Sequence, residues 1–112
     1  MPSDELSHQI LTILSDHPQT SQRQLARELG ISLGKVNYCL NALIEKGILK
    51  VNNFKNSKNK AAYVYVLTPK GIEEKAKVTA RFLKRKIEEF DALQAEIKKL
   101  KKQVESGLEH RV

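Results

Sequence analysis

The sequence has no tryptophan, three phenylalanines, three tyrosines and a single cysteine in 112 residues. The lone Cys39 excludes an internal disulfide, and one cysteine with three scattered histidines provides no zinc-ligand spacing. The N-terminal "MPSDELSH" is acidic and polar, unlike a signal peptide, and no apolar run approaches the length of a membrane span. We therefore expect a cytoplasmic protein with a small aliphatic core and with no metal, cofactor or membrane partner.

The sequence also lacks the motifs of a catalytic site. It contains no nucleophile elbow, no glycine-rich phosphate loop and no paired carboxylates in a plausible pocket. Glu88, Glu89 and Asp91 fall on a predicted helix surface, where solvated charges are the ordinary interpretation. We therefore predict that the protein is not an enzyme.

Positive charge is in excess, with a net charge of +7 and a pI of about 9.6. Charge alone favours two kinds of acidic partner, nucleic acid or an anionic membrane surface, and of these we expect nucleic acid. A core built from so short a chain is often marginal alone, so a partner subunit is also expected.

Caps and apolar periodicity predict three helices in the first half of the chain. The first begins after Ser3 and ends before "DHPQ", because Pro18 disfavours helical geometry at the residue before it. The second begins at Ser21, with Gln24 at the spacing of a capping box. The third begins after Ser32 and ends at the "KG" of residues 46–47. The expected inward residues are Leu6, Ile10, Ile13 and Leu14 in the first helix, Leu25, Ala26 and Leu29 in the second, and Val36, Leu40, Leu43 and Ile44 in the third.

A sharp bend separates the second and third helices. Ala26 is small where the helices must approach closely, and Gly30 allows the left-handed turn. Ile31 fills the corner, and Val36 packs the third helix against the second. Two helices joined by a short glycine-containing turn form a helix-turn-helix, although an ordinary helical hairpin is the alternative.

Two short segments rich in β-branched and aromatic residues follow, "ILKVNNF" and "AAYVYVL", separated by "KNSKNK". They predict an antiparallel hairpin with an asparagine-rich tip. Six lysines and no acidic residue lie between positions 46 and 70. We interpret the tip as a DNA-contacting wing rather than as a solubilising loop. The wing residues are Lys55, Lys58, Asn59 and Lys60.

After "LTPKG", where Thr68 can cap and Pro69 can begin a helix, the chain is predicted to be continuously helical. Apolar residues there recur with the seven-residue period of a coiled coil, interrupted by Lys86 at one inner position. A helix that folds back over its own domain is the alternative, and the pattern leaves parallel and antiparallel pairing open. We expect a DNA-binding domain over residues 1–69, a dimerisation helix over 70–106 and a tail over 107–112. The dimerisation residues are Leu83, Phe90, Leu93, Ile97, Leu100 and Val104.

The outward face of the third helix carries the residues expected to read DNA bases. Asparagine can form a bidentate pair with adenine, and tyrosine can contact phosphate or a thymine methyl group. The alternative is that these are plain solvent-facing residues. The expected base-reading residues are Gly34, Asn37, Tyr38 and Asn41, and the expected phosphate contacts are Ser21, Gln22, Arg23, Ser32 and Lys35.

The stretch "QLARELGISLGKVNYCLNALIEKGIL", followed by "LTPKG", resembles MarR-type winged helix-turn-helix transcriptional regulators. The short length and single long C-terminal helix are most similar to the small MarR-like regulators associated with bacterial exopolysaccharide gene clusters. The resemblance implies that the third helix enters the major groove, that the wing contacts DNA beside it, and that the protein is a homodimer. The family's Asp-x-Arg wing motif is missing, since Asn59 and Ala61 stand in its place.

The overall expectation is a mainly α protein with a small β-hairpin, a winged helix-turn-helix followed by a long coiled-coil helix. Its predicted function is that of a sequence-specific regulator that binds double-stranded DNA as a homodimer at an inverted-repeat operator. A winged-helix protein-interaction module without specific DNA binding is the alternative. RNA binding is a third possibility, but few exposed aromatics are predicted. Cys39 is expected to be buried and inert.

Overall fold

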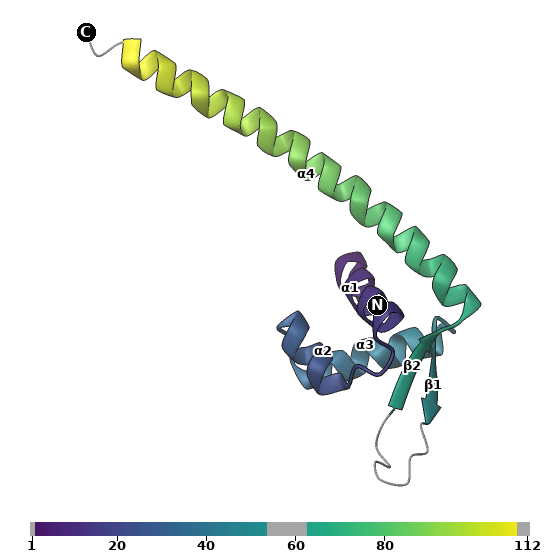
Figure 1. Cartoon of the computed structure of the whole chain (residues 1–112). Coiled ribbons are helices and arrows are strands. Elements are labelled where there is room, and N and C mark those ends of the chain that lie inside the picture. The colour runs from purple at the N-terminus through teal and green to yellow at the C-terminus, as the bar shows by residue number, and fades with distance from the viewer. Residues whose placement is uncertain (1, 54–62, 110–112) are drawn as a thin grey trace. The chain divides into compact units, whose positions relative to one another are not determined.

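The computed structural model describes residues 2–53 and 63–109 (Figure 1). By contact the chain divides into two compact units, residues 1–80 and 81–112. The fold is mainly helical with a two-stranded antiparallel hairpin, as the sequence predicts. The elements are α1 (Asp4–Asp16), α2 (Gln22–Leu29), α3 (Leu33–Glu45), β1 (Leu49–Asn53), β2 (Tyr63–Leu67) and α4 (Pro69–Glu109).

The predicted N-terminal caps of the first three helices are confirmed. The Ser3 hydroxyl oxygen accepts from the Leu6 N–H at 3.2 Å, and that of Ser32 accepts from the Lys35 N–H at 3.1 Å. Ser21 and Gln24 form the reciprocal capping box, with bonds of 3.1 and 2.9 Å. Serine oxygens thus satisfy amide groups that the helix itself leaves unpaired.

The turn between α2 and α3 has the geometry that the bend requires. Gly30 is left-handed, with φ 66° and ψ 33°, and the Ile31 N–H donates to the Ala26 carbonyl at 3.1 Å. Gly47 (φ 73°) ends α3 in the same way. Residues with a Cβ seldom adopt this conformation, so glycine sets the angle at which α3 leaves α2.

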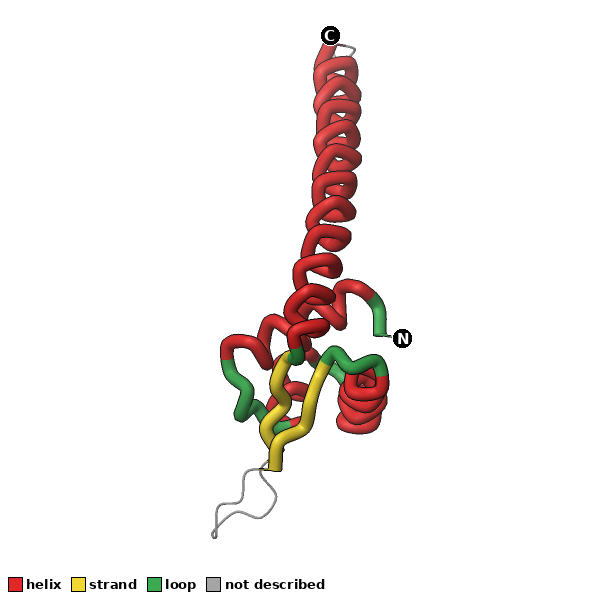
Figure 2. The backbone as a smooth tube through the Cα atoms, turned by 90° about the vertical axis from the view of Figure 1, so that its right-hand side faces the viewer, coloured by secondary structure: helices red, strands yellow, loops and turns green. Residues whose placement is uncertain are grey.

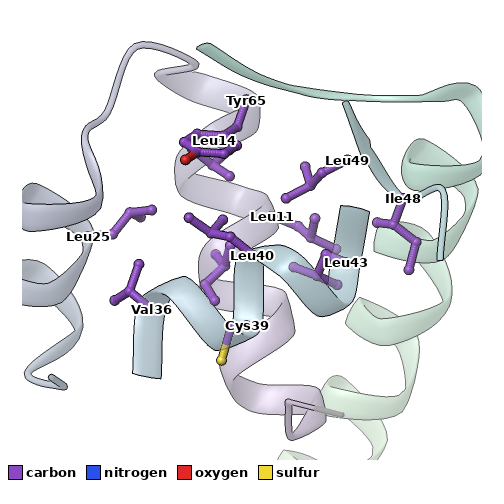
Figure 3. Close-up of a cluster of buried hydrophobic side chains, with 11 residues drawn as sticks. Leu11, Leu14, Leu25, Val36, Cys39, Leu40, Leu43, Ile48, Leu49 and Tyr65 are labelled. Atoms are coloured by element: carbon purple, nitrogen blue, oxygen red, sulfur yellow. The ribbon is translucent and has the colours of Figure 1, made fainter. Parts of the chain in front are cut away.

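Side chains from α1, α2, α3 and both strands converge on one buried cluster (Figure 3). Apart from Tyr65 the cluster is aliphatic or sulfur-containing, as the sequence predicts. The four residues predicted to face inward from α1 lie in the core (Ile10 and Leu14) or pack against it (Leu6 and Ile13), and Leu11, which was not predicted, is also fully buried. α1 also contacts β2, and its buried arc is wider than the predicted one.

The two strands lie side by side in an antiparallel ladder that pairs Leu49 with Leu67 and Val51 with Tyr65 (Figure 2). The Tyr65 N–H also donates to the Pro18 carbonyl at 3.3 Å, which holds the segment after α1 against β2. The predicted hairpin is confirmed in its strands. Its tip, with the wing residues Lys55, Lys58, Asn59 and Lys60, lies outside the described residues.

A set of short contacts joins the start of α4 to the end of α3. The Thr68 hydroxyl oxygen accepts from the Gly71 N–H at 3.0 Å, which confirms the predicted cap, and the hydroxyl donates to the Gly47 carbonyl. The Thr68 N–H donates to the Ile48 carbonyl at 3.1 Å. A Cβ at Gly71 would overlap the carbonyl oxygen of Ile48 and lie 3.1 Å from its carbon. The helix can approach the backbone this closely only because residue 71 is glycine.

The first compact unit extends beyond residue 69, the expected end of the DNA-binding domain. Gly71 and Val78 are buried within it, so the first turns of α4 complete its packing. At the other end, α4 continues through Gly107 to Glu109, three residues into the predicted tail. The functional division into a DNA-binding domain and a dimerisation helix stays a prediction.

Candidate nucleic-acid interface

The outward face of α3 holds the four residues predicted to read bases. Gly34, Asn37, Tyr38 and Asn41 are all exposed, and the Tyr38 side chain retains 60% of its accessible surface. The opposite face of the helix is fully buried in the core through Val36, Cys39, Leu40 and Leu43. The core therefore fixes the rotation of α3, and the polar face is presented to solvent as predicted.

A chain of side-chain hydrogen bonds crosses from β2 to the centre of this face. The Gln22 Nε2 amide donates to the Tyr65 hydroxyl oxygen at 2.8 Å. The Asn37 Nδ2 amide donates to Gln22 Oε1 at 3.3 Å, and Asn41 Nδ2 donates to Asn37 Oδ1 at 2.9 Å. Because Tyr65 is only 5% exposed, the chain is anchored in the core at one end. We call these four residues the amide relay.

The amide relay orients the two asparagines and leaves Asn41 able to bind further groups. A carboxamide has two N–H donors and an oxygen acceptor. The bond to Asn37 uses one N–H of Asn41, so its second N–H and its oxygen lie outside the relay. One donor beside one acceptor is the pattern with which asparagine pairs with the N7 and N6 edge of adenine.

Charge varies along α3. Lys35 lies exposed in the first turn, whereas Glu45 lies exposed in the last. A shallow hollow lined by Tyr38, Asn41, Ala42, Glu45 and Lys46 occupies the end that carries the carboxylate. Lys46 offsets the Glu45 carboxylate at that end, whereas Lys35 is the one cation on α3 itself and suits contact with phosphate near the start of the helix.

The residues predicted to contact phosphate fall into two groups. Arg23 and Lys35 are exposed near the starts of α2 and α3, where backbone N–H groups and the helix dipole also favour anions. The hydroxyls of Ser21 and Ser32 serve as caps, and the Gln22 carboxamide belongs to the amide relay. Their contact with phosphate remains a prediction, and for Gln22 it would compete with the bonds to Tyr65 and Asn37.

The structural role of Tyr65 was not predicted. The available signal was its place in "YVYVL", where alternation puts it on the inward face of a strand. A buried tyrosine usually finds a partner for its hydroxyl, but the sequence does not indicate which one. Gln22 lies 43 positions away and meets Tyr65 only after the hairpin has formed.

Cys39 is buried in the core, as predicted, on the face of α3 opposite the exposed polar residues. Burial raises the pKa of its thiol, and the positive charge of Lys35 opposes this shift to a smaller extent. The thiol is therefore protonated at neutral pH and is a poor nucleophile.

The predicted dimerisation residues lie on α4 in the second unit. Their side chains are between 43 and 62% exposed within a single chain. A groove between Ile97, Leu100 and Val104 is bordered by Lys101 and Glu105. The six predicted residues, Leu83, Phe90, Leu93, Ile97, Leu100 and Val104, are thus available to a partner.

The described residues hold neither a metal-binding cluster nor a membrane-spanning helix. Over residues 2–53 and 63–109, no group of three His, Cys, Asp or Glu side chains could hold a metal ion. Among the helices described, none combines the length and apolar character needed to cross a membrane.

Residues 3–50 match the family model described as winged helix-turn-helix DNA-binding. This segment contains α1, α2, α3 and the start of β1, and therefore every residue of the amide relay except Tyr65. No curated protein sequence is significantly similar to the chain.

Solved structures of similar fold include several transcriptional regulators. FabT of Streptococcus pneumoniae, solved in complex with DNA, is 27% identical, with a TM-score of 0.59 over 80% of this chain. A MarR/EmrR family regulator from Acinetobacter sp. ADP1 is 25% identical, with a TM-score of 0.56, and the match covers 89% of this chain and 75% of that one. BldR of Sulfolobus solfataricus is 22% identical, with a TM-score of 0.60 over 74% of this chain. The present chain spans 59% of the length of FabT and of BldR.

Proposed function

We propose that this protein is a MarR-like transcriptional regulator that binds double-stranded DNA sequence-specifically, as a homodimer, at an inverted-repeat operator. The observation that carries the proposal is the pair of oriented asparagines on the exposed face of α3, within a winged helix-turn-helix. More narrowly, we propose that it is one of the small MarR-like regulators associated with exopolysaccharide genes, because it resembles them in its short length and single long C-terminal helix. A cytoplasmic location is part of the same proposal.

In this proposal α3 is the recognition helix and lies in the major groove. An α-helix fits that groove, and its N-terminal residues are the ones that reach base edges in helix-turn-helix proteins. Gly34 fits this placement, because a Cβ built on it would meet nothing within 4 Å and the fold gives no steric reason for a glycine there. A glycine at the start of α3 instead allows DNA to approach closely.

Phosphate contacts would position the protein on the DNA. Arg23 and Lys35 are exposed cations at helix N-termini, and Ser21 and Ser32 are the caps of the same helices. We also assign the wing lysines 55, 58 and 60, with Asn59, to the DNA backbone. Such contacts strengthen binding to any sequence, and they make it dependent on salt.

The solved structures support the proposal through their fold and the DNA complex of one of them. FabT has been crystallised with DNA, and its similarity covers most of the present chain. The exposed apolar residues of α4 support a dimer, since a stripe of this length is seldom left in water.

The first prediction tests the recognition helix. Asn37→Ala and Asn41→Ala are each expected to reduce affinity for the operator by about 1–3 kcal/mol while leaving affinity for random duplex almost unchanged. Each lost contact carries sequence information rather than charge. The measurement is a parallel titration of operator and scrambled duplex by fluorescence anisotropy, with an operator first obtained by selection from a random library.

Lys35→Ala is the matched control from the same helix. This substitution should weaken binding to both duplexes by a similar factor. It should also reduce the slope of log affinity against log salt concentration by about one unit. Equal losses on both duplexes for the asparagine variants, or no loss on either, would show that α3 is not the reader. The protein-interaction module would then be the better explanation.

A second prediction concerns the anchor of the amide relay. Tyr65→Phe removes only the hydroxyl that accepts from Gln22, so the aromatic ring still fills the core. We expect operator affinity to fall about three- to ten-fold, because Asn37 and Asn41 would sample more rotamers before binding. Random-duplex affinity should be unchanged, and the thermal midpoint should fall by a few degrees at most. Operator affinity equal to that of the wild type would exclude an orienting role.

A further inference from the structure

The apolar stripe of α4 has the internal order of a two-stranded coiled coil. In heptad notation, position a holds Leu83, Phe90, Ile97 and Val104, and position d holds Lys86, Leu93, Leu100 and Gly107. The two C-terminal a residues are β-branched, and the d residues between and before them are leucine. Parallel dimers favour this combination, because β-branched side chains at a and leucine at d pack best between two parallel helices.

The charges beside the stripe also distinguish the two directions of pairing. Glu96 occupies a g position and Lys101 the next e position. In a parallel dimer g faces e of the following heptad on the other helix, so Glu96 of each chain would meet Lys101 of the other. In the antiparallel alignment with the longest overlap, which sets Ile97 opposite Leu93, Glu96 would instead face Glu96. The parallel dimer gains two attractive Glu96–Lys101 pairs, one on each side of the seam, so these charges favour parallel pairing.

Lys86, the one charged inner residue, is already accommodated within its own helix. Its ammonium nitrogen lies 3.1 Å from Glu89 Oε2 and 5.2 Å from the centroid of the Phe82 ring. Both partners, Glu89 and Phe82, are at g positions. The Lys86 ammonium group therefore lies toward the side of the coiled coil, while its aliphatic chain can remain at the d position. Two lysines can therefore occupy the same layer of a parallel pair without directing both charges into it.

We infer that α4 pairs with α4 of a second copy in a parallel, in-register coiled coil over residues 83–104, with Glu96 and Lys101 determining the direction. This inference rests on the proposed homodimer and names its interface. Parallel pairing places residue 81 of both chains at the same end of the coiled coil. The two DNA-binding units are therefore connected to the coiled coil at one and the same end.

Disulfide cross-linking of the full-length protein without DNA tests the direction. In an in-register parallel pair, Val104 of one chain meets Val104 of the other, so Val104→Cys should cross-link by itself under mild oxidation. In the antiparallel alignment Val104 faces Lys86, and only a mixture of Val104→Cys and Lys86→Cys chains should cross-link. The wild type, whose Cys39 is buried, is the control for background oxidation. Cross-linking only in the mixture, or in neither preparation, would overturn the inference.

Charge exchange is a second measurement with its own control. Glu96→Lys and Lys101→Glu should each raise the dissociation constant of the dimer about ten-fold, because two attractive pairs become repulsive. The double variant has the net charge of the wild type and should restore its affinity. Single variants that dimerise like the wild type would contradict parallel pairing. Sedimentation equilibrium without DNA measures the dimer dissociation constant of the wild type and of each variant. A protein that dimerises in this way but binds no operator would contradict the proposed function and leave the pairing inference intact.

Discussion

A chain that ends after Ala80 is expected to be monomeric and to bind an inverted-repeat operator at least about 100-fold more weakly than the full chain. Residues 1–80 form a compact unit by contact, so the shortened chain retains its core and the exposed face of α3. It loses the stripe of half-exposed apolar residues on α4. Two linked binding units gain roughly 10²–10⁴ in affinity over one, and that gain would disappear. Sedimentation equilibrium and titration of a complete operator and a single half-site measure both effects.

Truncation also removes charged residues, so a full-length control is needed. Leu93→Gln with Leu100→Gln disrupts the centre of the apolar stripe and retains every charge and every proposed DNA contact. This variant should be monomeric and should bind the operator as weakly as the truncated chain. If the chain ending at Ala80 still sediments as a stable dimer, the interface lies elsewhere and the assignment of α4 is wrong.

Gly71→Ala is expected to lower the free energy of unfolding by about 3 kcal/mol or more. A Cβ at this position would overlap the carbonyl oxygen of Ile48, a backbone atom that cannot move aside as a flexible side chain could. Relief of the overlap would shift the start of α4 and weaken the bonds that Thr68 makes to Gly47, Ile48 and Gly71. Urea unfolding followed by circular dichroism, at one fixed protein concentration, measures the loss.

Gly107→Ala is the matched control in the same helix. A Cβ there meets nothing within 4 Å, and alanine favours helix over glycine by about 1 kcal/mol. This substitution should therefore be neutral or stabilising. A Gly71→Ala protein as stable as the wild type would show that the start of α4 is not held against Ile48.

Local signals were sufficient to predict most of the described elements. The Ser21–Gln24 capping box, the left-handed Gly30 and the cap at Thr68 all depend on atoms within four residues along the chain. The apolar face of α3 follows from helical periodicity, which also determines that Asn37 and Asn41 face outward. The winged helix and its exposed asparagines could therefore be predicted from the sequence alone.

Other features depend on residues that are distant in sequence and meet only in the folded chain. The contact of Gln22 with Tyr65 spans 43 positions, and the close approach of Gly71 to Ile48 joins the start of α4 to the segment between α3 and β1. The burial of Leu11 likewise depends on the packing of α1 into a core shared with α2, α3 and both strands. By itself the sequence determined where helices and strands begin and, for α2 and α3, which face is apolar, since caps, turns and periodicity act over a few residues. Only the tertiary structure decided which side chains orient the asparagines and which glycine must remain glycine, because both depend on the distance between elements after packing.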